Sequence, residues 1–478
     1  MLSVETENAR HGVEAGMVQT FAIPSGKITK QLSFKRLGDD GRKLAISTNW
    51  LTLMDFNPDD RVIERSLGKD KGIEIIKVYD LLDAPLKTKK VYKRSYTSRK
   101  NNPIETLLEV GSQRLINESF GNAKRVHVIF TKGRIIITPI TSHKEQAIKN
   151  ATPESRSKVF AACTSGLDIC AMESSGFQIH SIIEMRPNER RDKKRDLTET
   201  GALTALRNLK KGIINVFNED ITTIDTNQLA EAVKQSPVTT FIASPQCDDH
   251  TNVKNNEAKE KSVEDLTTTV DMALDMLRVI DAIKPPVVQF ENVSGWYTSE
   301  AYNLLKIRLR RYGYIEYLDI AKATDRGGLT TRKRGFSVFT CLDAPFAFEK
   351  PPKPRTEKIW PIIEPFISGC RDVSHSKSIL DGAKCGRLRV ITPESITAPS
   401  ILKSQERMAK DSCVILHEGK YLWPSESLVK RLMGVPQSFS TDCVSKDISI
   451  EIVGQSQDHV HADLITRSIK KHIDYYFN

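Results

Sequence analysis

The 478-residue sequence lacks long hydrophobic runs, closely spaced cysteine pairs and an apolar N-terminal stretch. No apolar run approaches the roughly 18 residues of a membrane-spanning helix, so we expect no such helix. The eight cysteines form no CxxC pair, which favours a reducing cytoplasm and argues against a disulfide framework or a zinc ribbon. We therefore expect no metal site. The first residues, MLSVETENARHG, include acids and no apolar core, so we expect no secretory signal.

The composition is that of a folded protein with excess positive charge. Hydrophobic residues make up 39% of the chain and charged residues 27%, which excludes wholesale disorder. The length suggests about three domains. The net charge of +11 favours a polyanionic partner.

Residues 18–150 show the short apolar runs and turn residues that are typical of β-structure. The predicted strands are 42–47, 60–66, 72–78, 125–130 and 134–140. They form two hairpin patterns, and the segment LAISTNWLTLMDFNPDDRV, with Trp50 and Phe56, resembles the swapped-hairpin barrels of small DNA-binding regulators.

A basic segment, residues 84–102, lies between the two hairpins and contains no acid. Its cations are Lys87, Lys89, Lys90, Lys93, Arg94, Arg99 and Lys100, interleaved with Tyr92 and Tyr96. Such a segment can track nucleic-acid phosphates and gain affinity by releasing counterions. It can equally be a solvated linker, and the sequence leaves both interpretations open.

Residues 156–342 alternate between predicted strands and helices, which favours a parallel α/β sheet. The strands are 157–163, 178–184, 238–244, 286–292 and 335–341. A capping-box pattern at Ser262 and Asp265, with an apolar stripe from Leu266 to Ile283, predicts one helix that ends before Pro285. Residues 344–365 are proline-rich and predict a loop or domain junction, and helices return after residue 423.

Four segments at predicted strand ends carry residues suited to chemistry. They are the small-residue turn in VFAACTSGLDICAMESSGF (159–177) with Glu184 after the next strand, Cys247 in FIASPQCDDH, Glu291 in QFENVSGW, and Arg332 with Arg334 in GGLTTRKRGFSVF. Ligands and catalytic groups gather at the carboxyl ends of parallel strands. Each segment also has an ordinary interpretation: turn packing, an inert cysteine, a solvated acid and a basic strand edge.

The order of these segments resembles the DNA (cytosine-5)-methyltransferase family. Asp220 matches the family's acid after the third strand, and residues 423–439 and 450–469 resemble its closing segments. The departures are Ser-Pro-Gln-Cys for the usual Pro-Pro-Cys-Gln, Ala162 and Thr164 for glycines, Thr330 for Gln, and Gln455 for Asn. The resemblance covers about 156–342 and 393–478.

The resemblance implies a Rossmann-like α/β S-adenosylmethionine-dependent methyltransferase sheet, with a small target-recognition region and a mostly β N-terminal domain. The implied division is 1–155 (β-rich, DNA-binding), 156–342 (catalytic core), 343–393 (short target-recognition region) and 394–478 (completion of the core). Because the recognition region is short, we expect the N-terminal domain to add DNA contacts. The loop 248–263 either closes over DNA or is simply exposed. The residues expected to bind DNA are Lys254, Lys259 and Lys261 of this loop and Lys89, Lys90, Lys93 and Arg94 of the basic segment.

The same resemblance assigns the chemistry. The Cys247 thiolate attacks C6 of a flipped-out cytosine, Glu291 donates to N3, and Arg332 and Arg334 hold the ring oxygen or the phosphate. S-adenosylmethionine is the implied cofactor, and its expected binding residues are Phe160, Ala161, Gly166, Glu184, Met185, Asp220, Ile221 and Pro245. The implied protein is a bacterial or phage-encoded, cytoplasmic, nucleoid-associated enzyme of restriction-modification type that acts on double-stranded DNA as a monomer.

Three alternatives remain open. The chain could be a catalytically weak DNA-binding regulator, which the altered glycine and asparagine positions favour. It could modify RNA, although it lacks the extended Cys-Phe-Thr/Tyr motif of the family's RNA-modifying branch. It could also transfer a group other than methyl.

Overall fold

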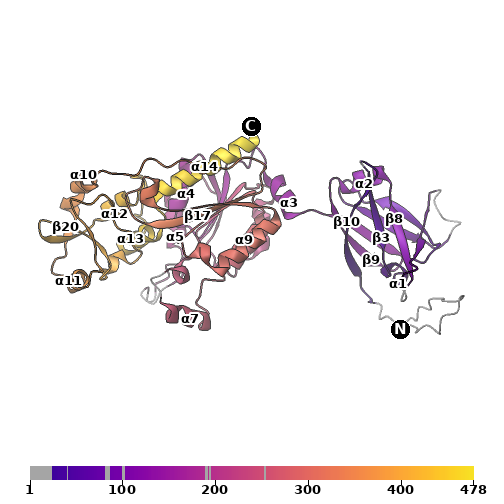
Figure 1. Cartoon of the computed structure of the whole chain (residues 1–478), viewed down its shortest axis with the longest axis horizontal. Coiled ribbons are helices and arrows are strands. Elements are labelled where there is room, and N and C mark those ends of the chain that lie inside the picture. The colour runs from indigo at the N-terminus through magenta and orange to yellow at the C-terminus, as the bar shows by residue number, and fades with distance from the viewer. Residues whose placement is uncertain are drawn as a thin grey trace. The chain divides into compact units, whose positions relative to one another are not determined.

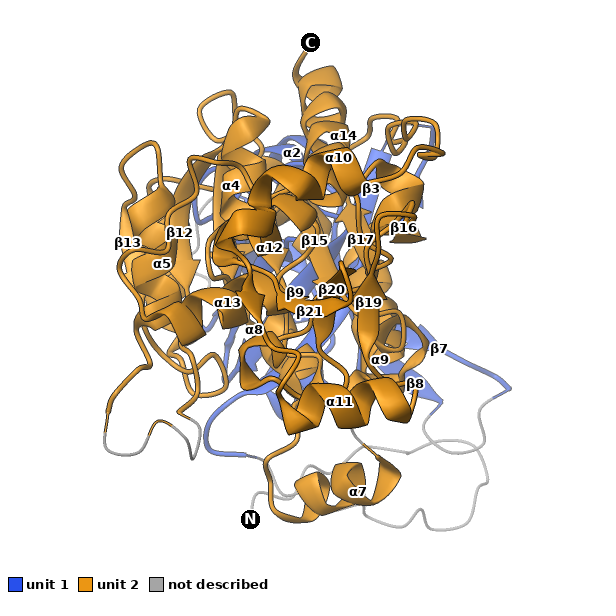
Figure 2. Ribbon diagram, turned by 90° about the vertical axis from the view of Figure 1, so that its left-hand side faces the viewer, with its two compact units in different colours: residues 1–142 blue, residues 143–478 orange. Residues whose placement is uncertain are grey.

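The computed structural model describes residues 24–39, 41–80, 87–98, 103–188, 192, 195–251 and 255–478. The chain divides into two compact units, Met1–Ser142 and His143–Asn478, which Figure 2 distinguishes by colour. No helix among the described residues is long and apolar enough to cross a membrane.

Two antiparallel sheets build the first unit, with the strand orders β1-β9-β10-β5-β4-β6 and β2-β3-β8-β7. The strands are β1 Ile28–Ser33, β2 Lys35–Leu37, β3 Gly41–Ser47, β4 Arg61–Ser66, β5 Ile73–Val78, β6 Lys89–Lys90, β7 Tyr92–Ser95, β8 Ile104–Val110, β9 Arg125–Thr131 and β10 Arg134–Ile140. Two helices, α1 Trp50–Leu53 and α2 Gln113–Phe120, accompany them.

Alternating burial explains why these segments are strands. Val126, Val128 and Phe130 of β9 are buried, and the residues between them are partly exposed, which is the period-two pattern of a half-buried strand. The two predicted hairpins are confirmed, because β4 pairs with β5 and β9 pairs with β10. The likeness to a swapped-hairpin barrel stays a prediction.

A seven-stranded mixed sheet with the order β13-β12-β11-β14-β15-β17-β16 forms the centre of the second unit. Its strands are β11 Lys158–Ala162, β12 Gln178–Ile183, β13 Asn215–Phe217, β14 Thr240–Ala243, β15 Val287–Asn292, β16 Ile315–Lys322 and β17 Lys333–Thr340. The first five in this order run parallel, and β17 is antiparallel to both of its neighbours. The predicted α/β class is confirmed.

Helices cover both faces of this sheet (Figure 1). They are α3 His143–Asn150, α4 Leu167–Ser174, α5 Thr200–Asn208, α6 Thr226–Lys234, α8 Met272–Ile283, α9 Glu300–Tyr312 and α14 His459–Phe477, whereas α7 Asn256–Glu264 contributes no residue to either core beside the sheet. One core joins the sheet to α6, α8 and α9, and the other joins it to α4 and α14. The carboxyl ends of β11, β12, β14 and β15 therefore share one edge of a rigid sheet.

A smaller sheet with the order β18-β21-β20-β19 follows in the chain. Its elements are α10 Trp360–Ile363, β18 Arg371–Asp372, α11 Lys377–Lys384, β19 Arg389–Ile391, β20 Cys413–His417 and β21 Lys420–Trp423, followed by α12 Glu426–Leu432 and α13 Lys446–Gln455. The boundary expected at residue 393 falls inside this sheet, because β19 pairs with β20.

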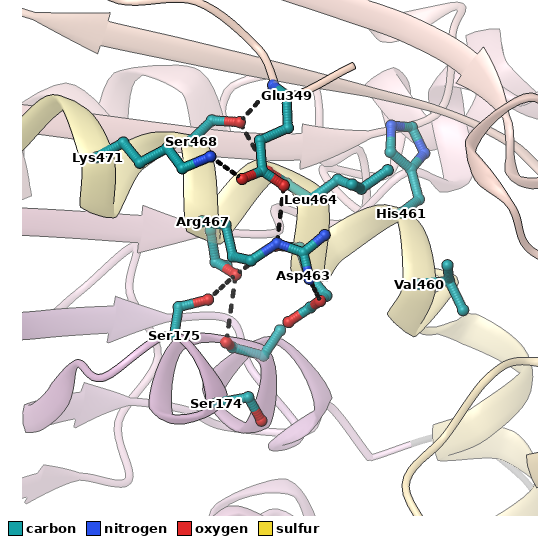
Figure 3. Close-up of polar contacts among 12 residues, drawn as sticks. Ser174, Ser175, Glu349, Val460, His461, Asp463, Leu464, Arg467, Ser468 and Lys471 are labelled. Carbon is teal, nitrogen blue, oxygen red and sulfur yellow. Dashed lines mark hydrogen bonds and ion pairs between the residues drawn. The ribbon is translucent and has the colours of Figure 1, made fainter. Parts of the chain in front are cut away.

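The end of the chain returns to the large sheet through α14, as Figure 3 shows. Arg467 Nε donates to Glu349 Oε2 at 2.8 Å, and the Ser468 hydroxyl accepts the Glu349 amide N–H at 2.9 Å. Thr466 donates to the Ala171 carbonyl of α4 at 3.2 Å. These bonds fix α14 against the core of the second unit.

The helix expected across residues 262–283 was predicted wrongly at its start. Ser262 lies inside α7, and α8 begins only at Met272. Leu266 has a φ of +54° and is 88% exposed. The cause is a long-range contact, because the buried Asp249 carboxylate accepts bonds from the Thr268 hydroxyl at 2.9 Å and the Thr269 amide at 2.8 Å.

The first unit also ends earlier than residue 155. Helix α3 belongs to the second unit, since the His143 ring stacks on Tyr312 with a centroid distance of 4.0 Å. Asn150 Nδ2 donates to the carbonyls of Ile283 and Lys284 at 3.1 and 2.9 Å.

Candidate active site

The nucleophile candidate lies just beyond the end of β14. Cys247 is half-buried and precedes a single 3-10 turn, Asp248–His250. The neighbouring loop is tied to the end of β15, because the buried Asn292 amide donates to the Pro245 carbonyl at 3.0 Å. The two predicted motifs thus lie side by side at one sheet edge.

Glu291 and Arg334 form the central ion pair of this edge. Glu291 closes β15, and the antiparallel register with β17 places it opposite Phe336, two residues from Arg334. Arg334 Nε lies 2.9 Å from Glu291 Oε1, with both side chains largely buried. The contact is an ion pair, and Glu291 Oε1 has no hydrogen-bond donor within the described part of the chain. A buried acceptor of this kind is ready for a ligand donor.

Arg332 is used differently from Arg334. Its two terminal nitrogens donate to the carbonyls of Ile401 and Gln455, each at 2.8 Å, and the side chain is buried. Burial, followed by the neighbouring Arg334, lowers the pKa of Arg332 to about 9, so it stays charged at neutral pH. Its bonds hold the last part of the chain against the strand edge.

The Cys247 thiol is protonated in this state. Burial is the largest influence and raises its pKa above the ordinary value. Arg334 and Arg332 oppose the rise, whereas Asp248 and Glu291 add to it. The two arginines therefore place positive charge near the sulfur, but they do not lower the pKa of the thiol below its ordinary value.

Two carboxylates, the buried Asp168 and the half-buried Glu184, form an acidic cluster beyond the ends of β11 and β12. Thr164 joins them, because its backbone N–H bonds to Glu184 and its hydroxyl bonds to Asp168. Burial raises the pKa of Glu184 to about 8, and the charge of Asp168 adds to the rise. Burial likewise raises the pKa of Asp168 to about 6, with a contribution from Glu291. At neutral pH Asp168 therefore carries most of the negative charge of the cluster, and a cationic ligand would favour ionisation of Glu184 as well.

Two glycines permit close packing around this cluster. A Cβ at Gly201 of α5 would lie 2.1 Å from Glu184 Oε1, so only glycine lets α5 approach the carboxylate. Gly166 has a φ of +107°, and a Cβ there would lie 3.0 Å from Ala205 Cα. Sequence reasoning missed Asp168 and Gly201. The only local signal was an acid four residues after Thr164, where the turn lacked its usual glycine.

The other residues expected to hold a cofactor are spread over this region. Phe160, Ala161 and Ile221 are buried, and Phe160 and Ile221 belong to the hydrophobic core between the sheet and α8. Met185 and Asp220 are half-buried beyond β12 and β13. Asp220 Oδ1 accepts from the amide and the hydroxyl of Thr222 at 2.9 and 2.8 Å, which fixes its orientation.

The residues expected to bind DNA fall in two places. Lys254 lies outside the described residues, and Lys259 and Lys261 lie on α7, which Asp249 anchors next to the Cys247 turn through Ser262 at 3.3 Å. The described part of the basic segment is partly strand, since β6 pairs with β4 and β7 pairs with β8.

The cations of that segment differ in their partners. Lys89 is bound to Glu64 at 2.8 Å, and Lys90 lies 2.5 Å from Asp59. Arg94 bonds to Tyr96, and Lys93 is exposed on the same strand, β7. Lys93 and Arg94 are thus exposed on β7, with Glu105 and Glu109 acting on Arg94 and Asp59 on Lys93.

Comparisons with known proteins find one family model and several solved structures that are similar to parts of this chain. Residues 198–378 match the family model of the C-5 cytosine-specific DNA methylase. No curated protein sequence matches the chain. Among solved structures, the chain resembles the Entamoeba histolytica methyltransferase EhMeth, with 15% identity, a TM-score of 0.50, and coverage of 65% of this chain and 97% of that one. It also resembles the S. pombe Dnmt2 methyltransferase, with 16% identity, a TM-score of 0.50, and coverage of 66% and 98%. These two likenesses show the methyltransferase fold.

Proposed function

We propose that this chain, whose residues 198–378 match the family model of the C-5 cytosine-specific DNA methylase, methylates C5 of cytosine in DNA through a covalent adduct at Cys247. The observation that carries the proposal is the convergence of Cys247 with the buried Glu291–Arg334 pair at one strand edge. Sulfur, carboxylate and guanidinium are the three groups that an attack on a pyrimidine ring requires.

The acidic cluster fits S-adenosylmethionine as the methyl donor. Burial disfavours the ionised forms of Asp168 and Glu184, the charge of Asp168 adds to this at Glu184, and a cationic ligand would favour the ionised forms. The Glu184 carboxylate can also accept bonds from ribose hydroxyls. When bound, the donor supplies an electrophilic methyl group.

The protein's own residues would act on the base in sequence. The Cys247 sulfur forms a bond to C6, and the electron pair of the C5–C6 double bond moves to C5 while charge spreads toward N3 and O2. The Glu291 carboxyl group, which Arg334 orients, faces N3 and shares a proton there. Arg334 places positive charge beside the ring oxygen. Once C5 carries the methyl group, loss of the C5 proton and release of Cys247 restore the ring.

This chemistry requires the target base to leave the helix. C6 is inaccessible to a protein sulfur inside a stacked duplex, and extrusion costs about a few kcal/mol. The Cys247 thiol is held protonated by burial, so we propose that the thiolate forms only after the base has entered.

The N-terminal unit is proposed to supply DNA contacts. Residues 1–142 contain 24 lysines and arginines against 16 acids, which is +8 of the chain's +11 charge. Charge of this kind favours phosphate binding. Removal of residues 1–142 should weaken DNA binding or change site preference, and unchanged affinity and preference would exclude this role.

Bisulfite sequencing of DNA from cells that express the wild type or Cys247→Ser tests the enzyme directly. We expect cytosines that resist bisulfite conversion in the wild type and are converted in the variant. Purified Cys247→Ser should keep its affinity for S-adenosylmethionine. If the wild type binds DNA but leaves no Cys247-dependent mark, the chain is a DNA-binding regulator. Incubation of the purified protein with RNA and labelled donor separates the RNA alternative.

A further inference from the structure

The outer face of α8 and α9 exposes an apolar stripe. Leu274 is 53% exposed, Leu304 is 57% exposed and Ile307 is 50% exposed. Together with the half-buried Leu277 these side chains line a shallow groove between the two helices. Clustered exposed aliphatic side chains of this kind mark an interaction surface.

The two helices run in the same direction. α8 leads into β15 and α9 leads out of it, so each helix is antiparallel to that strand. Their N-terminal turns carry acids, with Asp271 at the cap of α8 and Glu300 at the start of α9. The last turns of α9 carry Arg308, Arg310 and Arg311. The face is therefore acidic at one end, apolar in the middle and basic at the other.

The stripe on α9 is self-complementary. Glu300, Leu304, Ile307 and Arg311 follow the 4-3-4 spacing that puts side chains on one seam of a helix. The seam is symmetric about its midpoint between residues 305 and 306. When two such helices pack antiparallel about a two-fold axis, Leu304 faces Ile307 of the other helix and Glu300 faces Arg311.

We propose that this face joins two copies of the chain through antiparallel packing of their α8–α9 pairs. A two-fold interface uses the same patch on both subunits, which is what a palindromic seam provides. Neither Glu300 nor Arg311 has an ion-pair partner in the described part of the chain, and the pairing supplies one for each. The dimer replaces the monomer expected from the sequence, and it does not depend on the proposed enzymatic function.

Charge selects the second copy over other occupants. An acidic helix from another protein would pair with the arginine end but would repel Glu300 at the opposite end. A basic segment would be repelled by the arginines at the end of α9. A two-fold copy satisfies both ends at once, with like charges kept a helix length apart.

Sedimentation equilibrium of the full-length protein over about 1 to 200 µM tests the proposal. We expect a monomer–dimer equilibrium for the wild type. Leu304→Glu and Ile307→Glu should each abolish dimer formation, because they place like charges in the apolar centre. Leu380→Glu, on the exposed face of α11, is the matched control and should leave the equilibrium unchanged.

Charge reversal distinguishes this pairing from other modes of association. Glu300→Arg and Arg311→Glu should each weaken the dimer by about tenfold or more, since each creates like-charge contacts across the axis. The double variant restores both contacts with reversed polarity and should recover most of the affinity. Circular dichroism of each variant checks that the fold is intact.

A monomeric wild type at the highest concentration would overturn the proposal, as would a dimer that persists in Leu304→Glu. A double variant no tighter than either single variant would overturn the antiparallel register. Tighter wild-type self-association after removal of residues 1–142 would show that the N-terminal unit competes for this face, and the same variants would then be tested in that shortened chain.

Discussion

Two carboxylate environments share one edge of the large sheet, and they differ in how their charge is balanced. Glu291 at the end of β15 has Arg334 within 2.9 Å. Burial raises the pKa of Asp168 and of Glu184, beyond the ends of β11 and β12, and the charge of Asp168 adds to the rise at Glu184. The first environment is complete before any ligand arrives, because its cation comes from the chain. The second is completed only by a positive charge from outside.

This difference indicates which kind of ligand each side of the site binds. A paired carboxylate beside a thiol is organised in advance for a neutral base, and preorganised charge is the main source of catalytic stabilisation. An unpaired acidic cluster gains most from a cation, which matches the sulfonium and ammonium groups of the proposed donor. Variants that alter one environment and spare the other can test this division.

The largest effect is expected for Arg334→Met. The change leaves Glu291 buried without its cation, and breaking a buried pair costs about 3 kcal/mol or more of unfolding free energy. Methyl transfer should fall by at least about a hundredfold, because the charge beside the ring oxygen is lost. The transfer of labelled methyl groups to DNA gives the rate, and denaturant unfolding gives the stability. Lys333→Met, the exposed neighbour, is the control, and equal rates for the two variants would contradict the role of Arg334.

Gly201→Ala should affect the other environment alone. The added methyl group would lie 2.1 Å from Glu184 Oε1, so we expect donor affinity to fall by about tenfold or more. Gly212→Ala is the matched control, since no atom lies within 4 Å of its Cβ position. Calorimetry with S-adenosylmethionine measures both variants. Equal affinities would place the donor away from Glu184.

The pH dependence of donor binding should follow the acidic cluster. A cation binds the ionised carboxylates, so affinity should rise as pH increases through about 6 and again through about 8. Asp168→Asn should remove the lower step, and Glu184→Gln should remove the upper one. Without donor the sign reverses. The folded groups hold protons above their unfolded pKa values, so their contribution to stability declines as pH rises from about 4 to about 8. A flat affinity profile from pH 5 to 9 would refute this account.

The smallest effect is expected in the N-terminal unit, where Lys89 and Lys90 form close ion pairs and Lys93 and Arg94 are exposed on β7. Lys93→Ala with Arg94→Ala should reduce the salt dependence of DNA binding by about one to two phosphate contacts. Lys89→Ala with Lys90→Ala should change it less, because Glu64 and Asp59 already neutralise those lysines. Fluorescence anisotropy across a salt series measures both slopes. The reverse order would show that the paired lysines are the ones that meet DNA.

Much of this architecture could be predicted from local sequence patterns. Strand alternation identified the hairpins of the first unit, and the ends of apolar runs located Cys247 and Glu291, since parallel strands bring their carboxyl ends to one edge. Arg334 reaches the same edge because β17 is antiparallel to β15, so that its start lies beside the end of β15. Features that depend on distant contacts could not be predicted. The start of α8 is set by Asp249, which precedes it by more than twenty residues.

The missed parts of the site have the same origin. Arg332 bonds to Ile401 and Gln455, and no pattern near residue 332 signals carbonyls so far along the chain. The small sheet crosses residue 393 because β19 and β20 pair across a loop. Gly201 is an ordinary helical glycine until the position of Glu184 is known.

The return of α14 has a consequence for folding. The helix packs against the large sheet and α4, which leads from the acidic cluster. Without α14, part of one apolar face of the sheet would stay exposed to water. Residues 143–458 alone therefore cannot complete the core that supports this side of the site.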